Sequence, residues 1–398
     1  MKKTAISLIL ALAMVLGFVL VAAPQAEAAG TNHVAHTEGM NHCACGGTAQ
    51  GIGDHTACAS VTGAWIDLNA YVADTANVDS SVKFIGSEGV VSLASGNYYL
   101  SGNLKLAMPA YAKEGAVITI CLNGYDIEGP DGAGEAGRCF ACGGTEAPFN
   151  LCDCQGGGQI SSKATCNGGV MTVGEGRRAV INLYSGTYIG SQASTSPGSA
   201  FRFMAGVIRM YNAVIKDGVN HGQIVAAQAG GNVCVSKTAE MTMYGGIIEN
   251  GTADKGSNVY LMDSAKLTIY GGTITGGKNS DDIMAITSST VKVINLSGTT
   301  TLTTSGGSAT LDFTELDPSV TMTQNQQSVT LVGTGTTTTP PDPTEEPTQE
   351  PTQEPTEAPA PQPGADAPAD PTLWIVIGVA AVVIVAAVVV VVIKKKKT

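Results

Sequence analysis

The sequence predicts an all-β chain whose body is a parallel β-solenoid. Glycine supplies 50 of the 398 residues and aromatic residues only 5%, a composition that favours glycine-punctuated strands over a large helical core. Short strand-like units recur along the middle of the chain, and no helical period separates them. Such repeats stack as solenoids, in which each unit covers the apolar face of its neighbour.

The stretch LTIYGGTITGG at 267–277 shows the repeating unit most clearly. Leu267 and Ile269 alternate with Thr268 and Tyr270, as a half-buried strand requires. The glycine pairs that follow allow a bend or a close approach of the backbone. One unit cannot bury its own apolar face, so it predicts a stack.

Comparable units occupy a long stretch of the chain, at 96–106, 116–129, 148–162, 179–190, 206–218, 242–251 and 291–302. Aligning the apolar pairs of the units from 116 onward, with 267–277 included, places Cys121, Cys152, Tyr184, Tyr211, Tyr244, Tyr270 and Ile294 in a single column. The steps between these positions are 24 to 33 residues, which lies in the range of solenoid repeats.

Both ends of the chain carry targeting patterns. Residues 1–28 read as a secretory signal peptide, with two lysines, an apolar run and small residues at the end. Residues 372–393 are apolar and long enough for a transmembrane helix, and a basic tail follows at 394–398. We therefore expect a single-pass cell-membrane protein with its body outside the cell, its tail in the cytoplasm and the lipid bilayer as a partner.

Three regions lie between these ends. Residues 29–66 form a small Cys/His-rich module, 67–335 the solenoid body, and 336–371 a Pro/Thr/Glu-rich stalk that lacks an apolar period and is expected to be disordered. The whole chain has a net charge of −12, and the exported part is more acidic still because both ends are basic. This charge excludes nucleic acid as an expected partner.

The chain resembles the right-handed parallel β-helix (pectate-lyase-like) surface proteins of Gram-positive gut-type bacteria. The resemblance is carried by the Gly-Gly-x-Ile rungs, the stretches ICLNG and CDCQGGGQI and the flanking N-terminal module. The resemblance covers roughly residues 40–306 and implies the fold more strongly than an activity, because β-helices host lyases, hydrolases and adhesins alike.

The N-terminal cysteines offer a metal site. Cys43, Cys45, His55 and Cys58 supply three thiolates and one imidazole, which is the ligand set of a closed structural zinc site. The alternative is a disulfide among the three cysteines, since exported chains are exposed to oxidising conditions.

A second group of cysteines lies in the body. Cys121 and Cys152 fall on adjacent rungs of the aligned column, at a separation that suits a disulfide between two coils. Cys154 is a rival partner for Cys121. Cys139 and Cys142 could pair with each other, or join Cys152 and Cys154 as four thiolate ligands; disulfides are the preferred interpretation.

Candidates for catalysis are few. Asp281 and Asp282 with Lys278, and His221 in Asn-His-Gly, resemble the paired aspartates and Gly-His-Gly of polygalacturonase-like enzymes, but their order is reversed and no Arg-Ile-Lys triplet follows. The sequence therefore favours a binding protein over a polysaccharide lyase or glycoside hydrolase acting on an acidic polysaccharide.

The tyrosine column offers a binding surface. If Ile269 faces the core, then Tyr270 faces outward, and Tyr184, Tyr211 and Tyr244 line the same side. Such a ladder can bind a glycan or a surface protein, or simply support neighbouring rungs. We expect a cell-surface display protein that acts in adhesion or recognition, with a structural envelope component as a further alternative.

Overall fold

The structure is a computed structural model that describes residues 65–84, 86–132, 134–162, 168–192, 194, 197–220, 229–305, 308–325 and 328–334. The chain divides into two compact units, Met1–Glu345 and Glu346–Thr398, and every described residue belongs to the first. The described part contains no helix long and apolar enough to cross a membrane. The expected signal peptide, N-terminal module, stalk, span and tail lie outside the described residues, apart from Trp65 and Ile66.

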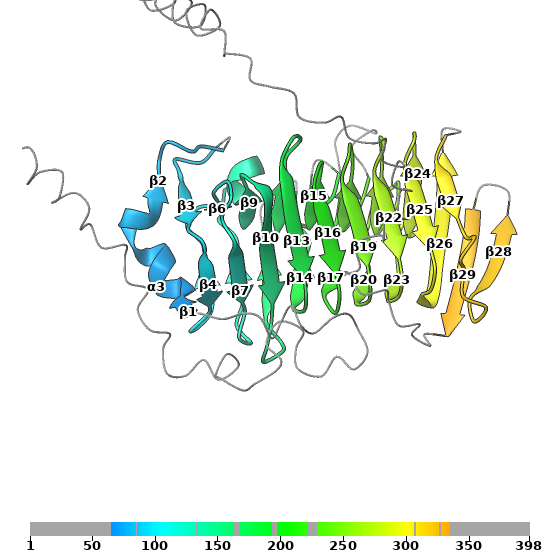
Figure 1. The fold of residues 1–398 in the computed structure, drawn as a ribbon, viewed down its shortest axis with the longest axis horizontal. Helices are drawn as coiled ribbons and strands as arrows, with labels where there is room; N and C mark the ends of the chain where they lie inside the picture. The colour runs from blue at the N-terminus through cyan, green and yellow to red at the C-terminus, as the bar shows by residue number, and fades with distance from the viewer. Residues whose placement is uncertain are drawn as a thin grey trace, which may run out of the picture. The chain divides into compact units, whose positions relative to one another are not determined.

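The described chain is all-β and forms three long, mostly parallel sheets stacked in rungs, as in a β-helix (Figure 1). The ten-stranded sheet contains, in spatial order, β1 (Trp65–Asp67), β4 (Gly96–Tyr99), β7 (Ile118–Cys121), β10 (Thr145–Cys152), β13 (Arg178–Leu183), β16 (Val207–Met210), β19 (Glu240–Met243), β22 (Lys266–Ile269), β25 (Thr290–Val293) and β27 (Thr310–Asp312). The seven-stranded sheet contains β5 (Leu104–Lys105), β8 (Ile127–Glu128), β11 (Gln159–Ser161), β14 (Thr187–Ile189), β17 (Val214–Lys216), β20 (Ile247–Glu249) and β23 (Thr273–Thr275).

The twelve-stranded sheet closes each coil. It contains β2 (Val78–Asp79), β3 (Val90–Leu93), β6 (Ala110–Ala112), β9 (Phe140–Cys142), β12 (Met171–Val173), β15 (Phe201–Phe203), β18 (Val233–Val235), β21 (Val259–Leu261), β24 (Ile283–Ile286), β26 (Ser297–Ser305), β29 (Ser328–Thr334) and β28 (Thr321–Asn325). Its pairs are parallel except at the two ends of the stack, where β2 and the β28–β29 hairpin pair antiparallel.

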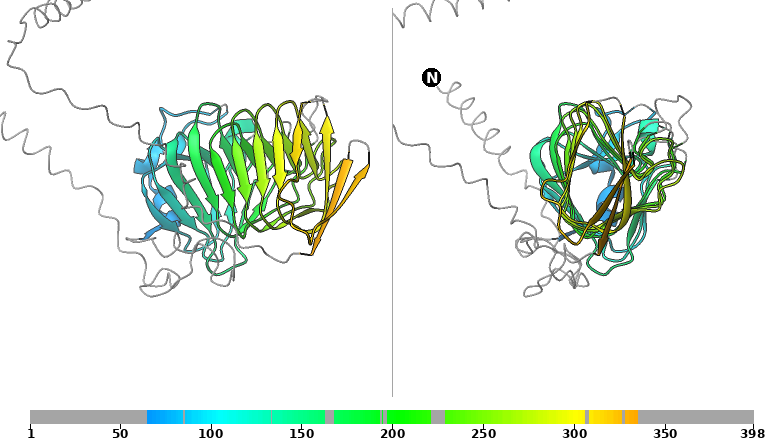
Figure 2. Two further views of the ribbon diagram at one scale, coloured as in Figure 1. Left: turned by 45° about the vertical axis from the view of Figure 1, so that its right-hand side comes forward. Right: turned by 90° about the vertical axis from the view of Figure 1, so that its right-hand side faces the viewer.

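Strand pairing confirms the aligned column. Cys152 pairs directly with Cys121, and the strand ends Leu183, Met210 and Met243 lie in register with one another. The residue after each of these strand ends is a tyrosine of the column. The view along the stack shows that successive coils superpose (Figure 2). The repeat read from the sequence is therefore one coil.

The core runs along the inside of the stack as one continuous apolar cluster. Ile181, Ile208, Met241 and Leu267 form one inward row of the ten-stranded sheet, and each is at most 1% exposed. This row follows from the period of two in a strand, which sends alternate side chains to the same face. Each coil thereby covers the apolar side chains of the next.

The two ends of the stack are closed differently. At the N-terminal end, α3 (Leu68–Ala73) begins at the cap Asp67, whose side chain accepts from Asn69 N, and buries Leu68. A 3₁₀ turn, η3 (Thr75–Asn77), follows; a second, η4 (Gly134–Gly137), precedes β9. At the C-terminal end the β28–β29 hairpin closes the stack (Figure 1).

Glycines mark the turn that leaves the seven-stranded sheet, because the chain there approaches the next part of the coil closely. A Cβ on Gly218 would collide with Ser199 Oγ and Gly231 O and lie 2.7 Å from Asn232 Oδ1. Gly251 and Gly277 hold equivalent positions, 2.9 Å from Asn258 Oδ1 and 2.8 Å from Asp282 Oδ1 by the same measure. The repeated glycines of the sequence are therefore packing requirements.

We expect Gly218→Ala to lower the free energy of unfolding by about 1–3 kcal/mol, because the added methyl group overpacks this turn. Gly102→Ala is the matched control, since a Cβ there would meet nothing within 4 Å. Urea denaturation of both variants measures the difference. Equal stability of the two variants would contradict the close packing of this turn.

Candidate functional site

The outward side of the ten-stranded sheet, from β13 to β25, is the strongest candidate surface, and we call it the tyrosine face. Ile208 and Met210 of β16 point into the core, so Val207 and Arg209 point outward. The same alternation holds along the sheet. The outward side chains therefore form rows that cross the strands: an edge row through Val207, a middle row through Arg209 and the tyrosine row.

The tyrosine row is a continuous stack of rings. Tyr184, Tyr211, Tyr244 and Tyr270 follow one another with ring centroids 4.9, 5.1 and 5.4 Å apart and interplanar angles of 12°, 15° and 10°. Tyr184 and Tyr211 are 7% exposed, while Tyr244 and Tyr270 are half-buried. Burial raises the pKa of Tyr244, and the Arg209 guanidinium opposes that rise.

This geometry limits what the tyrosines can bind. Because each ring covers the face of the next, a sugar ring cannot lie between them. The ring edges of Tyr244 and Tyr270 remain for contacts. The stack accordingly matches the supporting role that the sequence left open, and any recognition by this row must use ring edges and phenol groups rather than ring faces.

The middle row supplies hydrogen-bonding and charged groups beside the tyrosines. Asn182 Nδ2 donates to Asn150 Oδ1 at 2.8 Å, and Asn150 Nδ2 donates to Thr119 Oγ1 at 3.2 Å. The row continues through Arg209, Thr242, Thr268 and Lys292. Asn182 Oδ1 is buried with no hydrogen-bond partner within the described part of the chain. The middle row thus begins with the hydrogen-bonded amides of Asn150 and Asn182 and continues with residues that include the cations Arg209 and Lys292.

The edge row is apolar at one end and charged at the other. Val180 and Val207 pair in register, and Glu240 and Lys266 continue the row. Lys266 Nζ lies 2.7 Å from Glu240 Oε1. A surface groove of about 370 Å³ is lined by Arg178, Val180, Val207 and Glu240 among others. The tyrosine face thus carries a groove with apolar and charged walls, a row of polar side chains and a stack of tyrosine rings.

Asp282, a weak catalytic candidate from the sequence, is a buried structural residue. It is 6% exposed. Its Oδ1 accepts from Gly277 N and Asn258 Nδ2, and its Oδ2 accepts from the backbone and hydroxyl of Thr301. These bonds join three coils and occupy both carboxylate oxygens.

Asp282 ends a ladder of buried side-chain amides. Asn232 Nδ2 donates to Asn258 Oδ1 at 2.8 Å, and Asn258 Nδ2 donates to Asp282 Oδ1 at 2.8 Å. Each asparagine also binds the glycine turn of its own coil, through Gly218 N and Gly251 N. The sequence reasoning missed this ladder, although an Asn or Asp before each apolar trio (NVCV, NVYL, DIMA) was a visible signal.

The other catalytic candidates do not gather around Asp282. Asp281 Oδ2 accepts from Ser328 Oγ at 3.1 Å. Lys278 is exposed and donates its backbone N–H to Gly251 O. His221 lies outside the described residues. Asp282 therefore has a structural role. The catalytic candidates that the structure describes do not form an acid–base pair.

Cys121 and Cys152 lie in register as the column predicts, but the sulfur contact of Cys121 is with another cysteine. Cys121 Sγ lies 3.2 Å from Cys154 Sγ, the rival partner. Cys152, the register neighbour of Cys121, directs its thiol to Ile120 O at 3.5 Å. The geometry thus favours Cys154 over Cys152 as the partner of Cys121.

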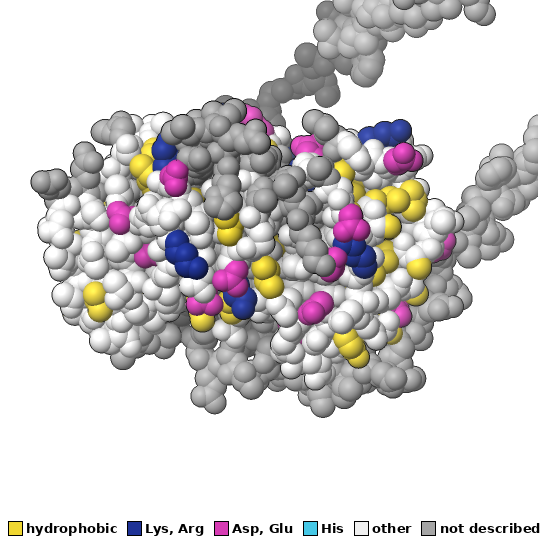
Figure 3. Space-filling view, turned by 180° about the vertical axis from the view of Figure 1, so that it is seen from behind, with side chains coloured by type: hydrophobic (Ala, Val, Ile, Leu, Met, Phe, Trp, Pro, Cys, Tyr) yellow, Lys and Arg dark blue, Asp and Glu magenta, His cyan; other side chains and the backbone are white. Residues whose placement is uncertain are grey.

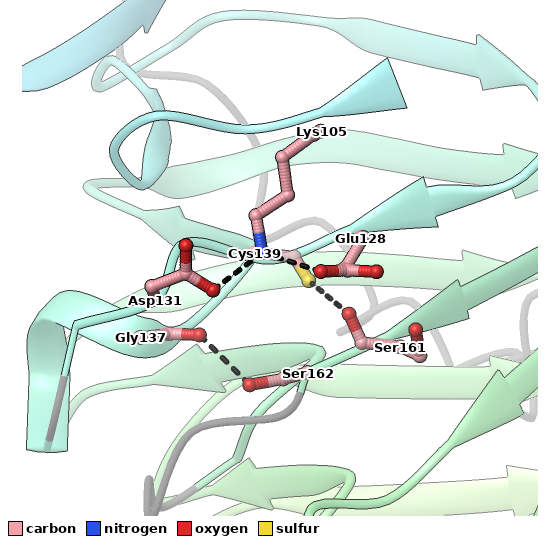
Figure 4. Close-up of polar contacts among 7 residues, drawn as sticks. All are labelled: Lys105, Glu128, Asp131, Gly137, Cys139, Ser161 and Ser162. Carbon is pink, nitrogen blue, oxygen red and sulfur yellow. Dashed lines mark hydrogen bonds and ion pairs between the residues drawn. The ribbon is translucent and has the colours of Figure 1, made fainter. Parts of the chain in front are cut away.

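Cys139 and Cys142 are both buried, and each has its own surroundings. Cys139 Sγ contacts Ser161 O at 3.4 Å, near the Lys105–Glu128–Asp131 ion pairs (Figure 4). Burial raises the pKa of Cys142 to about 12. Within the described ranges, no three His, Cys, Asp or Glu side chains are placed to hold a metal ion. Cys43, Cys45, His55 and Cys58, the expected zinc ligands, lie outside those ranges.

Charges of both signs are interspersed over the opposite side of the body (Figure 3). Comparison with known proteins adds no assignment: no protein family, curated protein or solved structure matches the chain.

Replacing Asp282 tests whether it is structural. We expect Asp282→Ala to lower the free energy of unfolding by about 3 kcal/mol, because it leaves buried donors of Asn258, Gly277 and Thr301 without an acceptor. Asp254→Ala is the control, since Asp254 is exposed, and should change stability by less than about 0.5 kcal/mol. Thermal and urea unfolding measure both variants; an unchanged Asp282→Ala protein would refute the structural role.

Proposed function

We propose that this chain is a membrane-anchored display protein of the cell surface that recognises a glycan or a partner surface through the tyrosine face. The observation that carries the proposal is the register of three chemically distinct outward rows over successive coils. Parallel strands repeat at about 4.8 Å, so the middle row offers a polar or charged side chain at each coil from β13 to β25. An extended partner can meet several rungs at once, and weak contacts then add up.

The interactions of Asp282 and Glu240 favour recognition over catalysis. Lyases and hydrolases need carboxylates that can bind a cation or exchange a proton beside the scissile bond. Asp282 instead gives both oxygens to buried donors, and Glu240 is paired with Lys266. The tyrosine face offers amides, cations and ring edges, which suit binding.

The proposal also covers the handedness and family of the solenoid, the membrane anchor and the zinc site. We assign the stack to right-handed parallel β-helices of the pectate-lyase-like kind, because crossovers between parallel strands of one sheet are almost always right-handed. Residues 372–393 anchor the chain in the membrane, and Cys43, Cys45, His55 and Cys58 hold a structural zinc ion. These assignments rest on sequence pattern alone.

A glycan array tests the recognition role. The secreted part, residues 29–335, should bind glycans on the array and release no unsaturated uronate from pectins. Arg209→Gln should weaken that binding about tenfold, because it removes a charged donor from the middle row. Lys216→Gln, in β17 of the seven-stranded sheet, should leave binding unchanged. Uronate release would show a lyase, and binding that survives Arg209→Gln would exclude the tyrosine face.

The cysteine contact gives a second test of the exported location. We propose a Cys121–Cys154 disulfide, because their sulfurs already touch and an exported body is exposed to oxidants. Peptide mapping without reduction should recover the two cysteines linked. Reduction should lower the free energy of unfolding by about 3–4 kcal/mol, as expected for a closed loop of this length. A recovered Cys121–Cys152 link would contradict the pairing.

A further inference from the structure

A second candidate site lies at the N-terminal end of the stack, where the cap folds over the outside of the first coil. The cap elements α3, η3 and β2 border a cavity of about 360 Å³ together with β3 and Lys113, which follows β6. This volume lies at the lower end of the roughly 300–1,000 Å³ found for small-molecule sites. The cavity has room for one small ligand and not for a folded partner.

Two opposite charges stand at this cavity. Lys113 Nζ lies 3.8 Å from Asp79 Oδ2. Asp79 Oδ1 accepts from the backbone N–H of Ser81 at 3.0 Å and from its hydroxyl at 2.5 Å. These bonds, with the charge of Lys113, hold the pKa of Asp79 below its usual range. The carboxylate is therefore ionised and positioned, with Oδ2 turned toward Lys113.

A buried hydroxyl in the same cavity lacks a partner. Ser92 lies between the core residues Val91 and Leu93 of β3, so its side chain points outward toward the cap. It is 9% exposed, and its Oγ has no hydrogen-bond partner among the described residues. A buried polar group without a partner costs about 1–3 kcal/mol. A ligand hydroxyl that reaches Ser92 would recover this cost.

Tyr71 fixes one wall of the cavity. Its hydroxyl donates to Ser92 O at 2.9 Å, and its ring packs edge-on against Tyr98 with the centroids 5.1 Å apart. Asn77 Nδ2 donates to Tyr71 O at 2.9 Å and ties η3 to the helix. The wall is thus held by the first coil and is in place before any ligand arrives, which reduces the entropy lost on binding.

We propose that this cap cavity binds a single neutral sugar residue, held by Asp79, Lys113 and Ser92. Adjacent hydroxyl groups of a sugar can donate to the carboxylate and accept from the ammonium, and a third can pair with Ser92 Oγ. This site rests on the proposed recognition of glycans and adds to it a subsite for a chain end.

The lining excludes other ligand classes. One carboxylate and one ammonium give no net charge, so a phosphate, a metal cation or a polyanion finds no excess of opposite charge. Serine, asparagine and ionised side chains dominate the walls, so an apolar ligand would leave them without partners. A neutral ligand rich in hydroxyl groups satisfies both conditions.

Ligand-observed NMR on the full chain in detergent micelles tests this site. The probes are the methyl glycosides of glucose, galactose, mannose and N-acetylglucosamine. At least one should bind, and Asp79→Asn and Lys113→Gln should each weaken that binding about tenfold, as expected for the loss of a hydrogen bond to a charged group. Ser92→Ala should weaken it less, about three- to fivefold, because a neutral bond is lost.

Matched controls separate loss of the site from loss of the fold. Asp312→Asn removes a carboxylate that accepts from the backbone and hydroxyl of Thr314, as Asp79 does from Ser81. Lys237→Gln removes a lysine from an ion pair of similar length. Both controls should bind the probe as the unaltered chain does. Failure of all four glycosides to bind, or equal binding by Asp79→Asn, would overturn the proposal.

The glycan array distinguishes this failure from failure of the recognition role. Array binding that falls in Arg209→Gln but not in Asp79→Asn would overturn the cap site and leave the tyrosine face in place. Array binding that falls in both variants supports the two sites together. An array with no bound glycan would remove the recognition of glycans and, with it, the cap site.

Discussion

The in-register pairing of parallel strands from successive coils is the constraint on which the rest of this structure depends. A slip of one residue would turn an inward row such as Ile208 and Met241 outward and bring Arg209 and Thr242 into the core. The turn glycines and the Asn232–Asn258–Asp282 ladder guard against such a slip, because each amide bonds both to its own coil and to the next. The outward rows are aligned because these bonds and close contacts hold successive coils in register.

Two strands of each coil could be predicted from sequence and the third could not. Strands such as β22 and β23 contain alternating apolar residues within a repeated pattern, which a period of two reveals. Strands of the twelve-stranded sheet such as β18 and β21 are buried on both sides. Because both sides of β18 and β21 are buried, their side chains do not alternate between apolar and polar, and the connections before these strands differ in length. The helix α3 was missed because six residues show no helical period either.

The alignment of the tyrosine column was predictable, but the surroundings of the described candidate residues were not. Alternation placed Tyr184 to Tyr270 in one outward column, and the strand register agrees. Sequence could not tell that the rings stack face to face, because that depends on side-chain rotation between coils. Asp282 shows the same limit: a paired aspartate reads as a catalytic motif, yet its hydrogen bonds to Gly277 and Thr301 come from segments whose approach only the folded coil reveals.

The repetition of a solenoid also decides where different kinds of binding can occur. A side of the stack carries rows that run across several coils, so it suits a long partner. The ends have no further coil to pair with and must be capped. At the N-terminal end the cap brings Tyr71 and Asp79 against Ser92 and Lys113 of the first coils. The cavity for one small ligand therefore lies where the capping residues fold against the first coils.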